Sequence, residues 1–289
     1  MLAPALIFFA IFILYPLFNT VRFSFYEYSL TSANKVFVGL ANYFDLGRDS
    51  VFWVSLRNNL IILVGSVTLQ VSVGLILAAI LQRGLSRRWS SAAQVIIFAP
   101  MVMSSVAVGL LWQLVLNPSI GLLDTLLRAL HLPSPMLGWL GDPQLAIFSV
   151  LLVACWQFTG FMMVILLAGM QGVPPELYEA GRLDGANEVQ MLAFITIPVI
   201  RNVVIAAVLI TMIGAFKVFD LVYVLTSGGP ANASEVLATY LYKNAFNLDR
   251  MGYANAIAVI LLMLSMMLGV VQLRFNAAQA RSAQDKAKA

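Results

Sequence analysis

Six apolar runs, each long enough to cross a lipid bilayer as a helix, dominate this sequence. They cover residues 2–25, 58–82, 92–116, 145–170, 202–226 and 253–273. About 20 apolar residues span a hydrocarbon core of about 30 Å, because an α-helix rises about 1.5 Å per residue. Of the 289 residues, 61% are hydrophobic and only 10% are charged, whereas an ordinary soluble domain is about 25% charged. The sequence therefore predicts an all-α integral membrane protein with six transmembrane helices.

The runs also predict how the chain is divided. The first run lacks a basic leader and a small-residue cleavage site, so we expect it to be a transmembrane helix and not a cleaved signal peptide. We divide the chain into a first helix at 1–26, an external loop at 27–57, a five-helix core at 58–273 and a cytoplasmic tail at 274–289. The connecting loops are too short to fold as domains of their own.

Basic residues near the ends of the runs predict the orientation. The short loop after the second run carries Arg83, Arg87 and Arg88, and the tail carries four more basic residues. The loops on the opposite side balance their basic residues with acidic ones. We therefore expect both termini, and the segment 174–198 between the fourth and fifth runs, to lie in the cytoplasm.

Several kinds of site are excluded by residue counts. The chain has one cysteine, Cys155, and one histidine, His131, so it predicts neither a disulfide framework nor a metal site built from cysteine and histidine. The net charge of +4 is typical of the orientation signal of membrane loops, and we expect contact with membrane lipid and no nucleic acid.

The polar interruption at 174–198 is the most informative segment outside the runs. Pro174 and Pro175 indicate a helix start, because proline is tolerated in a first turn where its missing N–H would have no partner. Glu176 and Glu179 follow in the first turns, where the helix dipole favours acidic side chains. A short helix is therefore expected to begin at these prolines.

The same segment predicts a turn and a second helix. Gly185 can adopt the left-handed conformation that ends a helix, and either Asp184 or Asn187 can cap the helix that follows. Such a helix-turn-helix is consistent with an ordinary solvated loop at the membrane surface or with a docking element for a cytosolic partner. Its composition alone does not decide between these two interpretations.

A specific sequence pattern favours the docking element. The pattern comprises Glu179-Ala180-Gly181, Asp184-Gly185-Ala186 and Ile195-Thr196-Ile197-Pro198. It resembles the EAA loop of binding-protein-dependent ABC importer permeases, with matching spacing throughout and with Gly181 where that family usually has a second alanine. Further stretches, such as 37–43 and 216–230, resemble the carbohydrate branch. The chain resembles the first-type permease of that branch and is similar, over nearly its whole length, to the larger permease of maltose-type and glycerol-3-phosphate-type importers.

The resemblance implies a fold, a function and partners. It implies the type I permease fold of ABC importers, and a cytoplasmic coupling helix that contacts a separate ATP-hydrolysing subunit. The residues implied in that contact are Glu176, Glu179, Ala180, Gly181, Asp184, Gly185 and Ala186. We expect a bacterial inner-membrane subunit that imports a sugar or oligosaccharide together with a second permease, a dimer of ATP-binding subunits and an extracytoplasmic solute-binding protein.

The chain itself is not expected to be an enzyme. No Gly-x-x-x-x-Gly-Lys-Ser/Thr phosphate loop occurs in it. The resemblance therefore places ATP and Mg²⁺ in the partner subunit and implies no cofactor in this chain. A membrane enzyme would instead need clustered histidine, aspartate or cysteine near one interface, and His131 has no such neighbours in the sequence.

Charged residues within the fifth run form another candidate site. Lys217 and Asp220 are three residues apart within the fifth run, which predicts that they share one helix face and form a mutual ion pair. The pair is either structural or, together with Tyr223, part of the lining of a sugar pathway. It is also what a self-sufficient secondary transporter or channel, the alternative function, would use.

Three uncharged residues complete the candidates for the substrate path. Gln157 and Thr159 lie beside aromatic residues in the fourth run, and Asn255 lies near the start of the sixth. Such side chains suit sugar hydroxyls, but each is more often an interhelical hydrogen bond. We expect Gln70, Gln94 and Gln113 to form interhelical hydrogen bonds and not to contact substrate.

Overall fold

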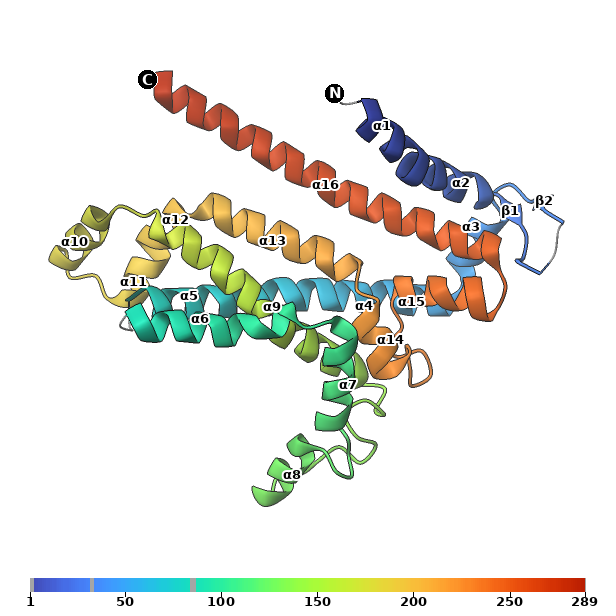
Figure 1. Ribbon diagram of the computed structural model, residues 1–289, viewed down its shortest axis with the longest axis horizontal. Helices are drawn as coiled ribbons and strands as arrows, with labels where there is room; N and C mark the ends of the chain where they lie inside the picture. The colour runs from blue at the N-terminus through green and yellow to red at the C-terminus, as the bar shows by residue number, and fades with distance from the viewer. Residues whose placement is uncertain (1–2, 32–33, 84–86, 289) are drawn as a thin grey trace. The chain divides into compact units, whose positions relative to one another are not determined.

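The computed structural model describes residues 3–31, 34–83 and 87–288 and is almost entirely helical (Figure 1). Four helices within this part of the chain are long and apolar enough to cross a membrane: Pro4–Phe23, Ser50–Gln82, Ala146–Gln171 and Met251–Val270. Two bent helix pairs also qualify if each pair counts as one span: Arg88–Val102 with Ser105–Val115, and Glu188–Val199 with Arg201–Phe216. Five of the six predicted apolar runs match these segments. The fifth run, 202–226, matches only in part, because the last pair begins at Glu188 in the predicted cytoplasmic segment and ends at Phe216.

Some of the predicted features lie outside the described residues. They include Leu2 at the start of the first run, the side chains of Arg83 and Arg87, and most side chains of the tail. The predicted divisions at residues 26, 57 and 273 concern membrane topology and stay predictions. By its own contacts the chain forms two compact units, 1–59 with 235–289, and 60–234.

The first unit combines both terminal segments with short elements between them. It contains α1 (Ala3–Phe9), η1 (Ala10–Leu14), α2 (Tyr15–Phe23), the antiparallel strands β1 (Tyr26–Glu27) and β2 (Val36–Phe37), α3 (Ala41–Arg48), the start of α4 (Ser50–Ser66), α15 (Leu237–Tyr242), η4 (Lys243–Asn247) and α16 (Met251–Lys288). Its buried core includes Leu46, Phe52, Leu237 and Ile257. Apolar side chains of α1 and α2 are largely exposed, as expected for a helix that faces lipid.

The second unit holds the remaining helices. After α4 come η2 (Val67–Val71), α5 (Ser72–Arg83), α6 (Arg87–Val102), α7 (Ser105–Val115), α8 (Leu122–Ala129), α9 (Ala146–Gln171), α10 (Pro175–Leu183), α11 (Glu188–Met191), η3 (Leu192–Thr196), α12 (Ile197–Val199), α13 (Arg201–Phe216) and α14 (Asp220–Thr226). The helices α5, α6 and α13 pack against α9. Small residues permit this packing: a Cβ on Gly74 would lie 3.0 Å from the backbone nitrogen of Met163.

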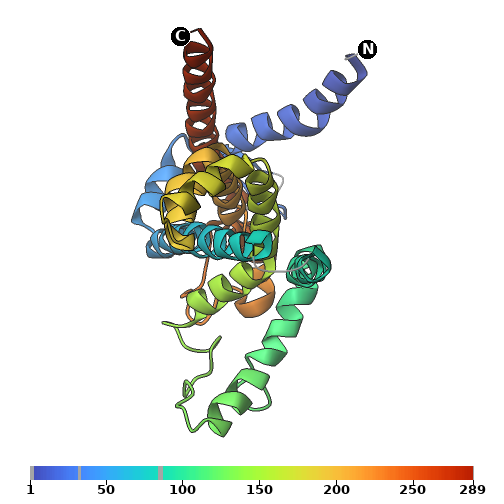
Figure 2. The same ribbon diagram turned by 90° about the vertical axis from the view of Figure 1, so that its left-hand side faces the viewer.

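Two predicted helices are broken, which the sequence analysis did not anticipate. The run 92–116 bends by 99° between α6 and α7, as Figure 2 shows, where α7 and α8 (green) lead away from α6. Pro100 lies inside α6, and Ser104 has an extended backbone with ψ of 135°. A proline removes a backbone donor and crowds the turn that precedes it, so Pro100 weakens α6 near its end but does not by itself explain a break that follows it.

The second break divides the run 202–226. Here α13 ends at Phe216, and α14 begins at Asp220 after Phe219 adopts φ of −133° and ψ of −60°. The connecting residues Lys217 and Val218 include neither glycine nor proline. The connection therefore carries no glycine or proline signal, and a periodicity argument does not detect the break.

Candidate functional site

The segment between α9 and α13 forms the predicted helix-turn-helix. Helix α10 begins at Pro175, with Pro174 as its N-cap and Glu176 in its first turn. Both Glu176 and Glu179 are exposed, so their carboxylates are available to a partner. The prediction of a short helix that begins at the two prolines is confirmed.

The turn that follows is well defined. Gly185 has φ of +78°, a left-handed conformation that glycine adopts without the steric cost paid by other residues. Asn187 caps α11: its side-chain oxygen accepts from the Gln190 backbone N–H at 2.9 Å, and the Gln190 side chain accepts from the Asn187 N–H at 2.8 Å. Of the two caps considered from the sequence, Asn187 is the one that forms.

Contacts across the turn hold the two helices together. The hydroxyl groups of Tyr178 and Thr196 are 3.1 Å apart, and Gly181 is buried against the second helix. A Cβ on Gly181 would lie 2.7 Å from the Cδ1 atom of Ile195. The glycine that departs from the usual alanine thus allows Ile195 to pack directly against the backbone of α10.

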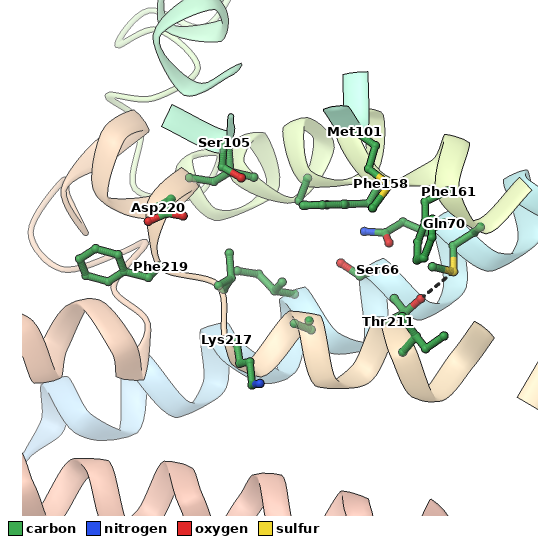
Figure 3. Close-up of a pocket in the computed structure, with 18 residues that line it drawn as sticks. Ser66, Gln70, Met101, Ser105, Phe158, Phe161, Thr211, Lys217, Phe219 and Asp220 are labelled. Atoms are coloured by element: carbon green, nitrogen blue, oxygen red, sulfur yellow. Dashed lines mark hydrogen bonds between the residues drawn. The ribbon is translucent and has the colours of Figure 1, made fainter. Parts of the chain in front are cut away.

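A cavity of about 320 Å³ lies inside the second unit (Figure 3). Its lining contains the polar side chains of Ser66, Gln70, Ser105 and Thr211, the charged side chains of Lys217 and Asp220, and the rings of Phe158, Phe161 and Phe219. Ser66 and Gln70 are buried, and Gln70 belongs to the π-helical segment η2. Single π-helical turns inside α-helices are frequent at functional sites.

Both helix breaks border this cavity. Met101 and Ser105 line it from the two sides of the α6–α7 break, and Lys217 and Asp220 line it from the α13–α14 break. Non-helical backbone at membrane depth is tolerated where it lines a cavity or is buried in protein. The breaks therefore build the wall of the cavity.

The predicted ion pair between Lys217 and Asp220 is wrong. Lys217 is the first residue of the non-helical connection and Asp220 is the first residue of α14, so the two do not share a helix face. Both side chains are exposed at the cavity, no ion pair joins them in this described part of the chain, and Figure 3 shows them pointing to different sides of the connection. The alternative function, a secondary transporter or channel that uses this ion pair, therefore loses the feature that supported it.

Gln157 and Thr159 make structural contacts instead of lining the cavity. The Gln157 side chain is 1% exposed, and its Nε2 donates to the Met103 carbonyl at 3.2 Å and to the Ser105 hydroxyl at 3.4 Å. The Thr159 hydroxyl donates to the Cys155 carbonyl at 2.6 Å. Gln157 thus holds the α6–α7 break against α9, which is the interhelical role that the sequence analysis kept open.

The other two predicted path residues also lie outside the cavity lining. Tyr223 stacks on Phe219, with ring centroids 5.3 Å apart and an interplanar angle of 14°, so it contacts a lining residue without being one. The Asn255 amide donates to the Tyr28 hydroxyl at 2.8 Å and to the Met251 carbonyl at 2.9 Å. Asn255 belongs to the first compact unit.

Sequence reasoning missed the uncharged half of the cavity lining. Ser66 and Gln70 are four residues apart in the second run, a spacing that places both on one helix face. The thiol of Cys155 contacts these two side chains. The spacing was a usable signal, whereas the contribution of Ser105 depends on the unpredicted break.

Comparisons with known proteins agree with this architecture. Residues 70–279 match the model of a family described as the binding-protein-dependent transport system inner membrane component. The probable ABC transporter permease protein YurN of Bacillus subtilis (strain 168) is 43% identical over 274 residues, which cover 95% of this chain and 94% of that protein. The trehalose/maltose transport system permease protein MalF of Thermococcus litoralis is 33% identical, covering 95% and 91%.

A solved structure supports the fold independently. A chain from the crystal structure of a bacterial ABC transporter involved in the import of the acidic polysaccharide alginate matches with a TM-score of 0.81 and 24% identity, covering 97% of this chain and 94% of that one. At this identity the match shows the fold, which is that of a type I ABC importer permease. Together with the family match over residues 70–279, it establishes that this chain belongs to the family of binding-protein-dependent transport system inner membrane components.

Proposed function

We propose that this chain is a permease subunit of an ATP-driven importer for a sugar or oligosaccharide. The observation that carries the proposal is the lining of the cavity, which combines aromatic rings with uncharged hydroxyl and amide groups. Aromatic faces pack against sugar rings while the polar groups bond to hydroxyls. The trehalose/maltose permease of Thermococcus litoralis and the lactose permease LacF of Rhizobium radiobacter, which is 32% identical, carry names with the same class of substrate.

The cavity belongs to half of a pathway in this proposal. A second permease of similar size completes the pathway, and a solute-binding protein docks on the outer face at the loops near Asn117 and Gly228. A dimer of cytosolic subunits binds ATP and Mg²⁺ and hydrolyses the nucleotide. Both termini lie in the cytoplasm, in agreement with the distribution of basic residues.

The coupling segment is where the ATP-hydrolysing subunit acts in this proposal. The residues named from the sequence for this contact are Glu176, Glu179, Ala180, Gly181, Asp184, Gly185 and Ala186. Gly181, which is buried against Ile195, supports α10 from behind in this proposal. Support comes from the exposed carboxylates of α10 and from the contacts that tie α10 to η3. Because α10 is bounded by Pro175 and Gly185, it moves as a body and transmits closure of the ATP-hydrolysing subunits to α13.

The substrate proposal is tested by reconstitution. The chain is coexpressed with a second permease, an ATPase subunit and a binding protein of the same type of importer, purified and placed in nanodiscs. ATP hydrolysis is measured with the binding protein and a panel of maltose, trehalose, lactose and glucose, with amino acids as controls. We expect stimulation by at least one sugar; stimulation by amino acids alone would contradict the proposal.

The coupling role is tested separately by Glu179→Lys. We expect normal insertion and assembly but little sugar uptake for each ATP hydrolysed, because reversal of charge disturbs the contact without touching the fold. The matched control is Glu188→Lys, an exposed carboxylate in α11 outside the proposed contact set. Normal uptake and normal coupling in Glu179→Lys would contradict the proposal that Glu179 contacts the ATP-hydrolysing subunit.

A further inference from the structure

A second pocket, of about 360 Å³, lies entirely within the first unit, beside the ribbon of β1 and β2. Its lining comes from three segments: the ribbon within 27–38, α3 within 41–45 and the start of α16 within 249–253. The polar and charged members of the lining are Glu27, Tyr28, Ser29, Asn34, Asn42, Asp45, Asp249, Arg250 and Tyr253. This β-ribbon pocket therefore differs in chemistry from the cavity of the second unit, whose lining is largely apolar.

Backbone contacts between the ribbon and α16 fix the walls of the β-ribbon pocket. The Met251 N–H donates to the Tyr28 carbonyl at 3.1 Å. A Cβ on Gly252 would lie 1.8 Å from the Tyr26 carbonyl oxygen, so no other residue fits at position 252 without moving the backbone. The walls are therefore already ordered, and a ligand loses no affinity in ordering them.

One buried side chain presents an unused acceptor to this pocket. Asn42 is 7% exposed and belongs to the lining. Its Nδ2 donates to the Ser24 carbonyl at 2.8 Å and to the Tyr26 carbonyl at 3.1 Å, while its Oδ1 receives no hydrogen bond from the described residues. Buried amide oxygens normally have a donor, so a ligand hydroxyl that reaches Oδ1 would complete the hydrogen bonding of Asn42.

The other polar groups of the lining suit sugar hydroxyls. Glu27 and Asp45 are exposed carboxylates, which accept hydrogen bonds. The Arg250 guanidinium lies 4.3 Å from the centroid of the Tyr253 ring and supplies donors beside an aromatic face. The Asp249 carboxylate is already engaged by two backbone N–H groups of the ribbon loop. Acceptors and donors bind the hydroxyls of a sugar, and ring faces pack against its apolar side.

We infer that the β-ribbon pocket is a second sugar-binding site, separate from the cavity of the second unit. Its volume of about 360 Å³ is at the lower end for small-molecule sites, which favours a mono- or disaccharide over a longer chain. The class of ligand rests on the proposed function, and the proposed orientation places residues 27–57 on the outer side of the membrane. There the pocket meets sugar that has not yet entered the transport pathway.

Protection of an introduced cysteine tests this site directly. Ser29→Cys, at a lining residue, is placed in a Cys155→Ser background, which removes the single native cysteine of the chain. Val36→Cys, at an exposed lining residue, gives a second reporter, and Ser119→Cys, at an exposed residue of the second unit, is the matched control. The complex in nanodiscs, without binding protein, is labelled with a maleimide in the presence and absence of maltose, trehalose, lactose or glucose.

We expect at least one sugar to slow labelling of both reporters in a saturable way, while labelling of Ser119→Cys stays unchanged. Adding Glu27→Ala to a reporter should raise the sugar concentration for half-protection at least about tenfold, as the loss of a hydrogen bond to a charged group implies. Adding Glu188→Ala, which removes an exposed carboxylate of α11 in the second unit, should leave that concentration unchanged.

Two kinds of result would overturn the inference. One is a lack of protection by every sugar, or protection by free lysine or spermidine alone, which would assign the pocket to organic cations. The other is a loss of protection in Gln70→Leu as large as that in Glu27→Ala, which would show that sugar acts from the cavity. Sugar that stimulates ATP hydrolysis without protecting the reporters contradicts the second site alone, whereas protection without stimulation contradicts the proposed function alone.

Discussion

At the scale of single residues, Asp49 organises the start of α4 in the first unit. Its Oδ2 accepts from the hydroxyls of Tyr240 and Tyr253, and its Oδ1 accepts from the Val51 N–H at 2.9 Å. Burial raises the pKa of the Asp49 carboxyl, but these hydrogen bonds outweigh burial and hold the pKa below its ordinary value. The ionised form is therefore the one that the fold stabilises.

This arrangement predicts a pH-dependent stability. A lowered pKa in the folded state contributes stability above the unfolded pKa of about 3.9, and this contribution is lost as the pH falls through the folded value. We expect Asp49→Asn to lower the stability at pH 7 by about 1–2 kcal/mol and to weaken the fall of Tm below pH 4. Thermal unfolding in detergent from pH 7 to pH 3 measures both. Asp45→Asn, at an exposed carboxylate, serves as the control, and an equal effect there would contradict the prediction.

Gly181 supports a second prediction at this scale. Gly181→Ala brings a Cβ within 2.7 Å of the Ile195 Cδ1 atom, the end of a flexible side chain. We therefore expect a loss of at most about 1 kcal/mol through overpacking, reduced by the higher helix propensity of alanine. Ile195→Val removes the clashing methyl group and should recover most of that loss in the double variant. The four Tm values of the double-mutant cycle test this pairing. Additive losses would show that the two side chains do not meet.

At the scale of elements, the capping box of α11 controls the second helix of the coupling segment. Asn187→Ala removes the acceptor for the Gln190 N–H, and the loss of such a cap costs about 1 kcal/mol. We expect faster hydrogen exchange at residues 188–191, with little change in α10. Asn187→Asp retains an acceptor and should preserve protection. Unchanged exchange in Asn187→Ala would mean that packing of Met191, which is buried, suffices to hold α11.

The elements also show how far the sequence reaches. The six apolar runs and the turn at Gly185 follow from span length and from the conformational freedom of glycine, both of which are local properties. The two helix breaks do not follow from local properties. Pro100 is a partial signal for the α6–α7 break, and the connection at 217–219 contains no glycine or proline to mark the α13–α14 break. The predicted ion pair is wrong because Lys217 and Asp220 were assigned to one continuous helix. Ser66 and Gln70 were not predicted as cavity residues.

At the scale of the whole molecule, the cavity unites residues from four distant parts of the chain, one of them the α6–α7 break at Met101 and Ser105. Ser66 and Gln70 come from the second span, Phe158 and Phe161 from α9, and Thr211 from α13. No single helix carries the site, so its chemistry depends on how the second unit packs. A substrate contact must therefore be distinguished from a packing defect by comparing uptake with assembly.

Substitution of Gln70 allows uptake to be compared with assembly. It is buried at the cavity and lies in η2, so Gln70→Leu exchanges an amide for an apolar group of similar size. Loss of one hydrogen bond to a sugar hydroxyl, worth about 1 kcal/mol, predicts a rise of about fivefold in KM for uptake. The control is Thr68→Val, which changes an exposed residue of the same π-helical turn whose hydroxyl donates to the Val64 carbonyl at 2.7 Å. If Gln70 contacts the sugar, its KM rises while the yield of assembled complex and the affinity of the free binding protein for sugar stay unchanged; a fall in assembly with an unchanged KM would instead assign Gln70 to packing around Cys155.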